Sequence, residues 1–301
     1  MWIIAEFFAT DFADESAFER FVLQQTLPLV PHDAGSSSAV YDVAADQISW
    51  NMVMHETLGL TVEGAVDRLG IRPLCFGAAW KIADLLVEHA LSATSLSPAR
   101  GTRWTIAEKT RHARALRGRA APLSSDHDIW LRLLVAYAGL EETRHSLVHR
   151  TATLDALGSI TGVTRSGTPL RPISRDEQEH FCRAVLVSAE RVIAGSMTPR
   201  ERNRLAWHLD GVAGVTAHPK LGAVRPSDTV LKVQVIVDST SIDWPKIIAR
   251  INQPPEQEVD LVLLLPDGER FLVRLEDVPP ALTQLDPTNP PHWAEVLGDD
   301  G

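Results

Sequence analysis

The chain has 301 residues, enough for two domains, and its 45% hydrophobic and 23% charged residues are ordinary for a globular protein. Its net charge of −10 argues against non-specific nucleic-acid binding by the whole surface, although it leaves room for a local basic face. No apolar run approaches the roughly 20 residues that span a bilayer. The first ten residues contain Glu6 and no basic segment, which is not typical of a signal peptide. We therefore expect a cytoplasmic protein with no membrane segment.

The first 60 residues predict a mixed region of short strands and one helix. Asp14 is placed to cap a short helix, and residues 40–43 and 48–53 have the composition of strands. The helix is expected to bury three apolar side chains at helical spacing: Phe18, Phe21 and Val22.

From about residue 61 the apolar residues recur at helical spacing. Helices are expected at about 72–91, 102–119, 126–149, 174–194 and 199–212. Capping boxes at Ser174 to Glu177 and at Thr198 to Glu201 mark two of the starts. Residues 151–172 contain glycines spaced as in a β-hairpin. The two cysteines, Cys75 and Cys182, lie far apart in apolar helical patterns and are expected to be free buried thiols.

The segment from residue 100 to 119 is strongly basic. Seven basic residues less one acid, Glu108, give it a charge of +6 in a protein of −10. This excess indicates a face for phosphate groups, although a solvated surface helix is the alternative. The residues expected to contact RNA are Arg103, Lys109, Arg111, Arg114 and Arg117.

After Gly211 the composition changes. Residues 216–229 have the character of a linker, and residues 230–301 predict a small α/β unit with the order β-α-β-β and an irregular tail. The predicted domains are therefore residues 1–60, 61–215 and 230–301, with a linker between the last two.

The densest cluster of side chains capable of catalysis is one stretch, residues 141–150, at the end of the third predicted helix. Arginine can hold a phosphate through its planar guanidinium, and histidine exchanges protons near neutral pH. Together they are sufficient to cleave RNA without a metal ion, with the ribose 2′-OH as nucleophile. The candidate catalytic residues are Arg144, His149, His145, Glu141 and Glu142.

Helical geometry limits how these residues combine. Arg144 and His149 are five positions apart, which separates them by about 140° around a straight helix. One rigid helix therefore cannot direct both side chains to one phosphate, whereas an unwound helix end or a second copy of the chain could. His145 and His149, four positions apart, share a face.

The spacing of Arg144, a polar residue at His145, and His149 resembles the motif of the HEPN superfamily (higher eukaryotes and prokaryotes nucleotide-binding). The resemblance covers about residues 61–215. It implies a mainly α fold, a HEPN-like bundle of four or five helices with a β-hairpin insertion, followed here by the small C-terminal α/β unit. It also implies a homodimer in which two motifs face each other through the helical bundle.

By this resemblance, an active member is an endoribonuclease that needs no metal or other cofactor, and many members are toxins or defence effectors. RNA and an antitoxin or regulatory protein are then the expected partners. Arg144 would stabilise phosphate charge, His149 would act as general acid or base, His145 would support it, and Glu141 or Glu142 would orient His145.

Two alternatives remain open. The first is a non-catalytic bundle that binds RNA or a partner protein. The second, weaker alternative is a metal-dependent enzyme, because Glu142 and His145 also match the ExxH pattern of di-iron bundles. Such a site normally needs a second ExxH and further glutamates on facing helices, and no metal site is predicted.

Overall fold

The computed structural model describes residues 12–26, 36–53, 72–92, 94, 103–116, 123–124, 126–213, 219–226, 230–237, 242–251, 258–275, 278, 282–285 and 295–297. The chain divides into two compact units. The helical unit contains Met1–Leu29 and Leu60–Pro226, and the sheet unit contains Val30–Gly59 and Ser227–Gly301. Each unit has its own apolar core, so each is described separately.

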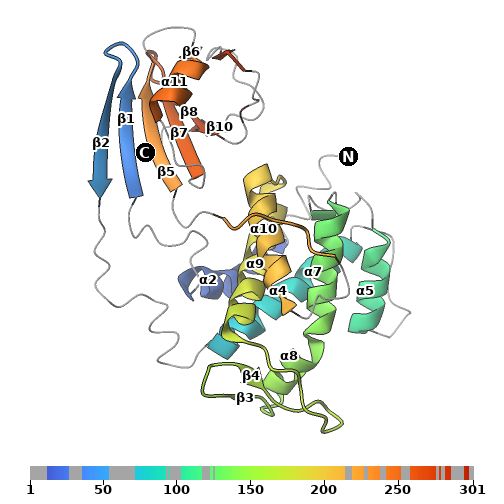
Figure 1. Ribbon diagram of the computed structural model, residues 1–301. Coiled ribbons are helices and arrows are strands. Elements are labelled where there is room, and N and C mark those ends of the chain that lie inside the picture. Colours follow the sequence, from blue (N-terminus) through green and yellow to red (C-terminus); the bar gives the residue numbers. More distant parts are fainter. Residues whose placement is uncertain are drawn as a thin grey trace. The chain divides into compact units, whose positions relative to one another are not determined.

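The helical unit makes the protein mainly α (Figure 1). Its helices are α2 (Ala17–Thr26), α4 (Arg72–Ser92), α5 (Ile106–Arg114), α7 (His127–Gly139), α8 (Glu141–Val148), α9 (Arg175–Ala194) and α10 (Pro199–Gly211). A short hairpin of β3 (Thr153–Leu154) and β4 (Ile160–Thr161) follows α8. Among the described residues between 72 and 211, each of the five predicted helices is present in the predicted order, and the one over residues 126–149 is divided in two.

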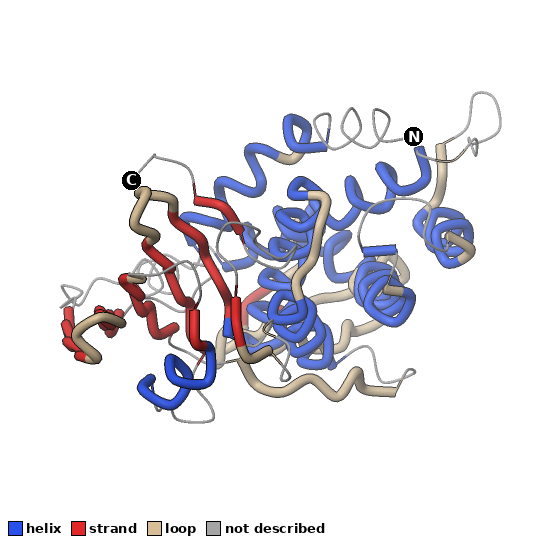
Figure 2. The backbone as a smooth tube through the Cα atoms, turned by 90° about the horizontal axis from the view of Figure 1, so that it is seen from above, coloured by secondary structure: helices blue, strands red, loops and turns tan. Residues whose placement is uncertain are grey.

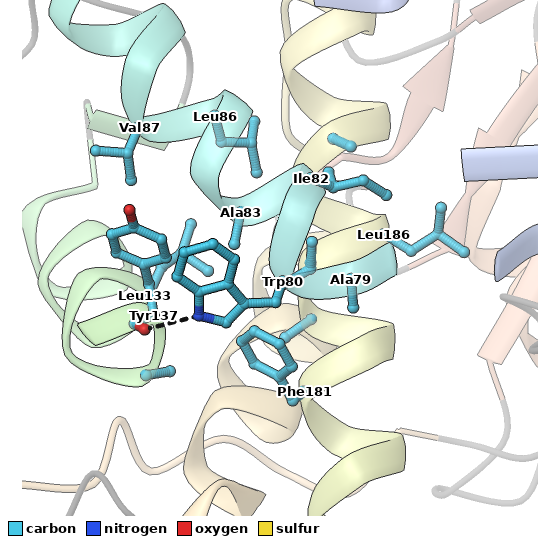
Figure 3. Close-up of a cluster of buried hydrophobic side chains, with 14 of the residues drawn as sticks. Ala79, Trp80, Ile82, Ala83, Leu86, Val87, Leu133, Tyr137, Phe181 and Leu186 are labelled. Carbon is cyan, nitrogen blue, oxygen red and sulfur yellow. Dashed lines mark hydrogen bonds between the residues drawn. The ribbon is translucent and has the colours of Figure 1, made fainter. Parts of the chain in front are cut away.

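Helix α4 lies at the centre of this unit because it is apolar on several sides. Phe76, Trp80, Ile82 and Val87 are all buried, and α4 contacts α2, α5, α7, α8 and α9. Figure 3 shows Trp80 of α4 between Phe181 of α9 and Tyr137 of α7.

Side-chain caps define the helix starts, as the sequence predicted. The hydroxyls of Ser174 and Thr198 accept hydrogen bonds from the third backbone N–H of α9 and α10. Thr105 and Glu108 form a further reciprocal capping box at the start of α5. Gly195, with φ of 70°, ends α9 in the left-handed conformation that glycine adopts most easily.

The predicted helix over residues 126–149 is divided at Leu140, whose φ and ψ are −103° and 5°. The backbone hydrogen bonds continue through the bend, because Leu140 N–H bonds the Ala136 carbonyl and Arg144 N–H bonds the Leu140 carbonyl. Gly139, a weak helix former, lies directly before the bend. Helix α8 is therefore a separate short helix whose direction is set by the bend.

The prediction for the first helix was wrong about its buried face. Phe18 and Phe21 are 74% and 59% exposed, and Val22 is only partly buried. Phe12 and Leu23 are buried instead, and the Phe12 ring lies 5.4 Å from that of His89. Residues 12–15 form a helical turn before α2, and both the N–H and the hydroxyl of Ser16 bond the Phe12 carbonyl at its end.

The sheet unit is a mixed six-stranded sheet with the order β10-β8-β7-β5-β1-β2. Its strands are β1 (Ser36–Asp42), β2 (Gln47–Val53), β5 (Val230–Ile236), β7 (Glu258–Leu264), β8 (Arg270–Arg274) and β10 (Glu295–Leu297). Strands β1, β5 and β7 are parallel, and the remaining pairs are antiparallel. Figure 2 shows these strands side by side.

Helix α11 (Trp244–Ile251) packs on this sheet through Trp244, Ile247 and Ile251. The order β5-α11-β7-β8 is the predicted β-α-β-β order, and β6 (Ile242–Asp243) pairs with β9 (Gln284–Leu285) beside it. The predicted separate region of residues 1–60 is not a unit of its own. Its helix α2 belongs to the helical unit, and β1 extends the C-terminal sheet by pairing with β5.

Candidate functional site

Two histidine rings lie in contact on α8. The ring centroids of His145 and His149 are 4.1 Å apart and the rings are tilted by 47°. The pair follows from helical spacing, because residues four positions apart lie one above the other. His149 is exposed and caps the helix, with its backbone N–H bonded to the His145 carbonyl. The predicted shared face of the two imidazoles is confirmed.

Arg165 completes this cluster from the loop after β4. Its Nε donates a hydrogen bond to Nε2 of His145 at 2.7 Å, and its Nη2 lies 3.0 Å from Nδ1 of the same ring. Arg165 lies in a tight turn that two backbone hydrogen bonds close. The Thr164 N–H donates to the Thr168 carbonyl, and the N–H of Gly167, whose φ is 81°, donates to the Thr164 carbonyl. Sequence reasoning missed this arginine because it is 20 residues from His145, and only its place in a glycine turn after the motif could have indicated it. We call His145, His149 and Arg165 the histidine–arginine cluster.

A buried contact fixes the hairpin to α8. The carbonyl of Ser146 accepts the backbone N–H groups of Thr151 and Ala152, and its Oγ lies 2.8 Å from Oγ1 of Thr151. Arg150, with φ of 59°, reverses the chain between helix and hairpin. A Cβ at Gly162 would lie 2.5 Å from Ser146 Oγ and 2.8 Å from the Thr151 carbonyl oxygen, so only glycine allows this approach.

Arg144 turns away from the histidines. Its guanidinium carbon lies 4.8 Å from the centre of the Trp80 ring, a cation–π contact with a side chain that is 2% exposed. His149 instead contacts His145. One chain therefore does not bring Arg144 and His149 together, as the angular separation around a helix led us to expect.

Trp80 connects Arg144 to the core. Its Nε1 donates a hydrogen bond to the Tyr137 carbonyl at 3.2 Å, and the two rings stack at 5.0 Å (Figure 3). The Tyr137 hydroxyl donates to Asp84 at 2.5 Å, and Lys109 Nζ lies 2.6 Å from both Asp84 and Glu88. Burial, followed by the bond to Asp84, raises the pKa of Tyr137, so its hydroxyl keeps its proton.

The charges of the cluster favour a neutral His145. Burial lowers its pKa, and the positive charges of Arg165 and His149 lower it further against the opposite effect of Glu142. Burial raises the pKa of Glu141, reinforced by Glu142 and opposed by Arg165. Among the described residues, the His145 ring is hydrogen-bonded by Arg165 and not by either glutamate. The predicted orienting role of Glu141 or Glu142 is therefore limited here to the charge of Glu142, which raises the pKa of His145.

The basic helix contributes fewer surface cations than predicted. Arg103, Arg111 and Arg114 are exposed, whereas Lys109 is 6% exposed because its ammonium is held between Asp84 and Glu88. Lys109 is thus corrected from an RNA contact to a buried link between α5 and α4. Arg117 lies outside the described residues.

In the described part of the chain, no three side chains of the metal-ligating types gather at one point. The ExxH pair Glu142 and His145 therefore has no third ligand there. Within the same residues, no helix is both long and apolar enough to cross a membrane.

Comparison of the chain with protein-family models, curated proteins and solved structures finds no match. The site is therefore interpreted from its own geometry.

The close approach at Gly162 predicts that any side chain added there lowers the stability of the protein. Gly162→Ala is expected to lower the free energy of unfolding by about 1–3 kcal/mol, because the new methyl group meets backbone atoms that cannot move aside. Gly139→Ala is the matched control, since its Cβ would meet nothing within 4 Å. That change should be neutral or stabilising by up to about 1 kcal/mol. Urea unfolding of both variants measures the difference, and equal stabilities would contradict the close approach.

Proposed function

We propose that the helical unit binds RNA and cleaves it without a metal ion, at the histidine–arginine cluster. The observation that carries the proposal is the contact of two imidazoles, 4.1 Å apart, with a guanidinium at hydrogen-bonding distance from one of them. Two proton-transfer groups beside a fixed positive charge are what transesterification of a phosphodiester needs.

The chemistry assigns a role to each member. In the bound state the Arg165 N–H that bonds Nε2 of His145 turns to the phosphate. The freed nitrogen of the neutral His145 ring then takes the proton of the ribose 2′-OH as that oxygen attacks the adjacent phosphorus. His149 donates a proton to the departing 5′-oxygen as its bond to phosphorus breaks. Arg165 offsets the charge that develops on the phosphoryl oxygens. The products are a 2′,3′-cyclic phosphate and a free 5′-OH, so the protons balance and no co-reactant is consumed.

The surrounding charge favours a phosphate. Arg165 and Arg150 are exposed, and Arg144 of α8 adds a third positive charge against the two acids of that helix, Glu141 and Glu142. A phosphate anion beside Arg165 would remove part of the repulsion that lowers the pKa of His145. Binding and protonation of His145 are therefore mutually favourable.

The resemblance to the HEPN superfamily supports the same proposal. The mainly helical unit carries the Arg144–His149 spacing on a short helix followed by a hairpin. In this proposal Arg144 holds α8 on Trp80, and Arg165 takes the role at the phosphate that the motif gives to its arginine. A homodimer and an antitoxin or regulatory partner belong to the proposal as consequences of the resemblance.

A non-catalytic RNA-binding or interaction module is the second candidate. The position of Arg144 favours it, because the arginine of the motif faces Trp80 and not the histidines. The two candidates share the RNA-binding surface and differ only in whether the histidines transfer protons.

Incubation with RNA in EDTA separates them. The wild type is expected to cleave single-stranded RNA in EDTA and to leave 2′,3′-cyclic phosphate ends. His149→Ala should lower the rate about a hundredfold or more, because it removes the proton donor. Circular dichroism checks that the fold is unchanged. RNA left intact by the wild type would exclude the enzyme and leave the module.

Arg165→Gln tests the assignment of the arginine. We expect the cleavage rate to fall about a hundredfold, because the developing negative charge loses its partner.

The acidic limb of kcat/KM against pH should lie below pH 6.5 in the wild type, since the lowered pKa of His145 keeps the ring neutral down to lower pH. In Arg165→Gln this limb should move to higher pH, because a charge that lowers the pKa has gone. A lower rate with an unmoved limb would show that Arg165 does not act beside His145.

A further inference from the structure

Helix α5 has an exposed face with two arginines and a buried face that packs on the core. Ala107, Arg111 and Arg114 are exposed and follow one another at helical spacing, whereas Lys109 and Ala113 face the core. The acid of this segment, Glu108, is engaged in the helix cap, where its carboxylate accepts bonds from the Thr105 N–H and hydroxyl. Glu108 keeps its negative charge there, because the bonds from Thr105 lower its pKa, but the three exposed arginines Arg103, Arg111 and Arg114 outnumber it in a protein of net charge −10.

An aromatic pair lies beside these arginines. The ring centroids of Trp104 and His112 are 4.6 Å apart at 78°, and both side chains are partly exposed. Arg111 Nη2 lies 3.3 Å from His112 Nε2, so the guanidinium borders the pair. Aromatic rings next to arginines are the surface on which proteins stack unpaired nucleobases while the cations hold the backbone.

The direction of α5 places this pair toward the histidine–arginine cluster. Trp130, near the start of α7, donates to the Ala113 carbonyl, near the end of α5. Lys109, one turn earlier in α5, shares Asp84 with Tyr137, near the end of α7. The two helices therefore run antiparallel, and Trp104 lies toward the end of α7 that continues into α8.

We infer that Trp104 and His112 form a nucleobase-stacking platform, with Arg103, Arg111 and Arg114 contacting the phosphates, and that the RNA this protein binds is single-stranded. This inference rests on the proposed function and names its substrate class. Stacking on a side chain needs an unpaired base, whereas paired bases in an RNA duplex are already stacked on one another. The platform holds the strand, and the cluster on α8 acts on it.

Binding is tested in the His149→Ala protein, so that cleavage does not remove the ligand. Fluorescence anisotropy with a labelled oligouridylate should show salt-dependent binding that is weaker for the corresponding duplex. Trp104→Ala should weaken single-strand binding about tenfold or more, whereas Trp104→Phe should retain most of it because a ring remains. Unchanged affinity in Trp104→Ala, or a duplex bound as tightly as the single strand, would overturn the platform.

The arginines are tested through salt dependence. Arg111→Ala should reduce the slope of log K against log salt by about 0.7, the value for one phosphate contact on a single strand. Lys220→Ala removes an exposed cation outside α5 and should leave the slope unchanged. An equal reduction in both variants would contradict a defined phosphate contact.

The outcome is distinct from that of the cleavage test. Binding that depends on Trp104 without cleavage by the wild type would uphold the platform and reject the enzyme. Cleavage by a wild type whose binding is insensitive to Trp104 would reject the platform and keep the enzyme.

Discussion

The contacts of the buried Trp80 side chain are the interactions on which the geometry of the site depends. Its indole N–H bonds the Tyr137 carbonyl, its ring stacks on that of Tyr137, and Arg144 lies over it. One side chain of α4 thereby touches α7 just before the bend at Leu140 and α8 just after it. These contacts join the two short helices on either side of the bend to α4.

The orientation of α8 divides its reactive residues. Arg144 faces inward to Trp80, and His145 and His149 share another face at the end of the helix. The guanidinium beside the histidines comes from Arg165, which the Ser146–Thr151 contact and the close approach at Gly162 hold in place. A site that a single helix cannot build is thus assembled from a helix and a hairpin.

The same core ties the basic helix to the site. Lys109 bonds Asp84, which accepts the hydroxyl of Tyr137, the ring that stacks on Trp80. A buried lysine is costly unless it is paired, and here two carboxylates lie 2.6 Å from it. Lys109, which we expected on the surface, therefore holds α5 against α4, while the arginines around it remain exposed.

Local signals in the sequence predicted much of the fold. The cap sequences at Ser174 and Thr198 mark helix starts because they satisfy backbone groups within one turn, and both starts are confirmed, with a reciprocal capping box at Thr198. The shared face of His145 and His149 is likewise a local property of one helix.

Contacts distant in sequence could not be predicted in this way. Phe18 and Phe21 have the right spacing for a core, yet they are exposed and Phe12 and Leu23 are buried in their place. The pairing of β1 with β5 joins strands about 190 residues apart, and it left no mark in the composition of either. Arg165 and the buried position of Lys109 depend on tertiary contacts of the same kind.

The most direct test of the account is an NMR titration of the imidazoles of His145 and His149. The pH is varied with and without a ribonucleoside 3′-monophosphate as the probe. The account predicts that the pKa of His145 lies below 6.5 in the free protein and rises when the nucleotide binds beside Arg165. It also predicts that the resonances of both rings shift. Imidazole resonances and a His145 pKa that do not change with the nucleotide would contradict a phosphate site at this cluster.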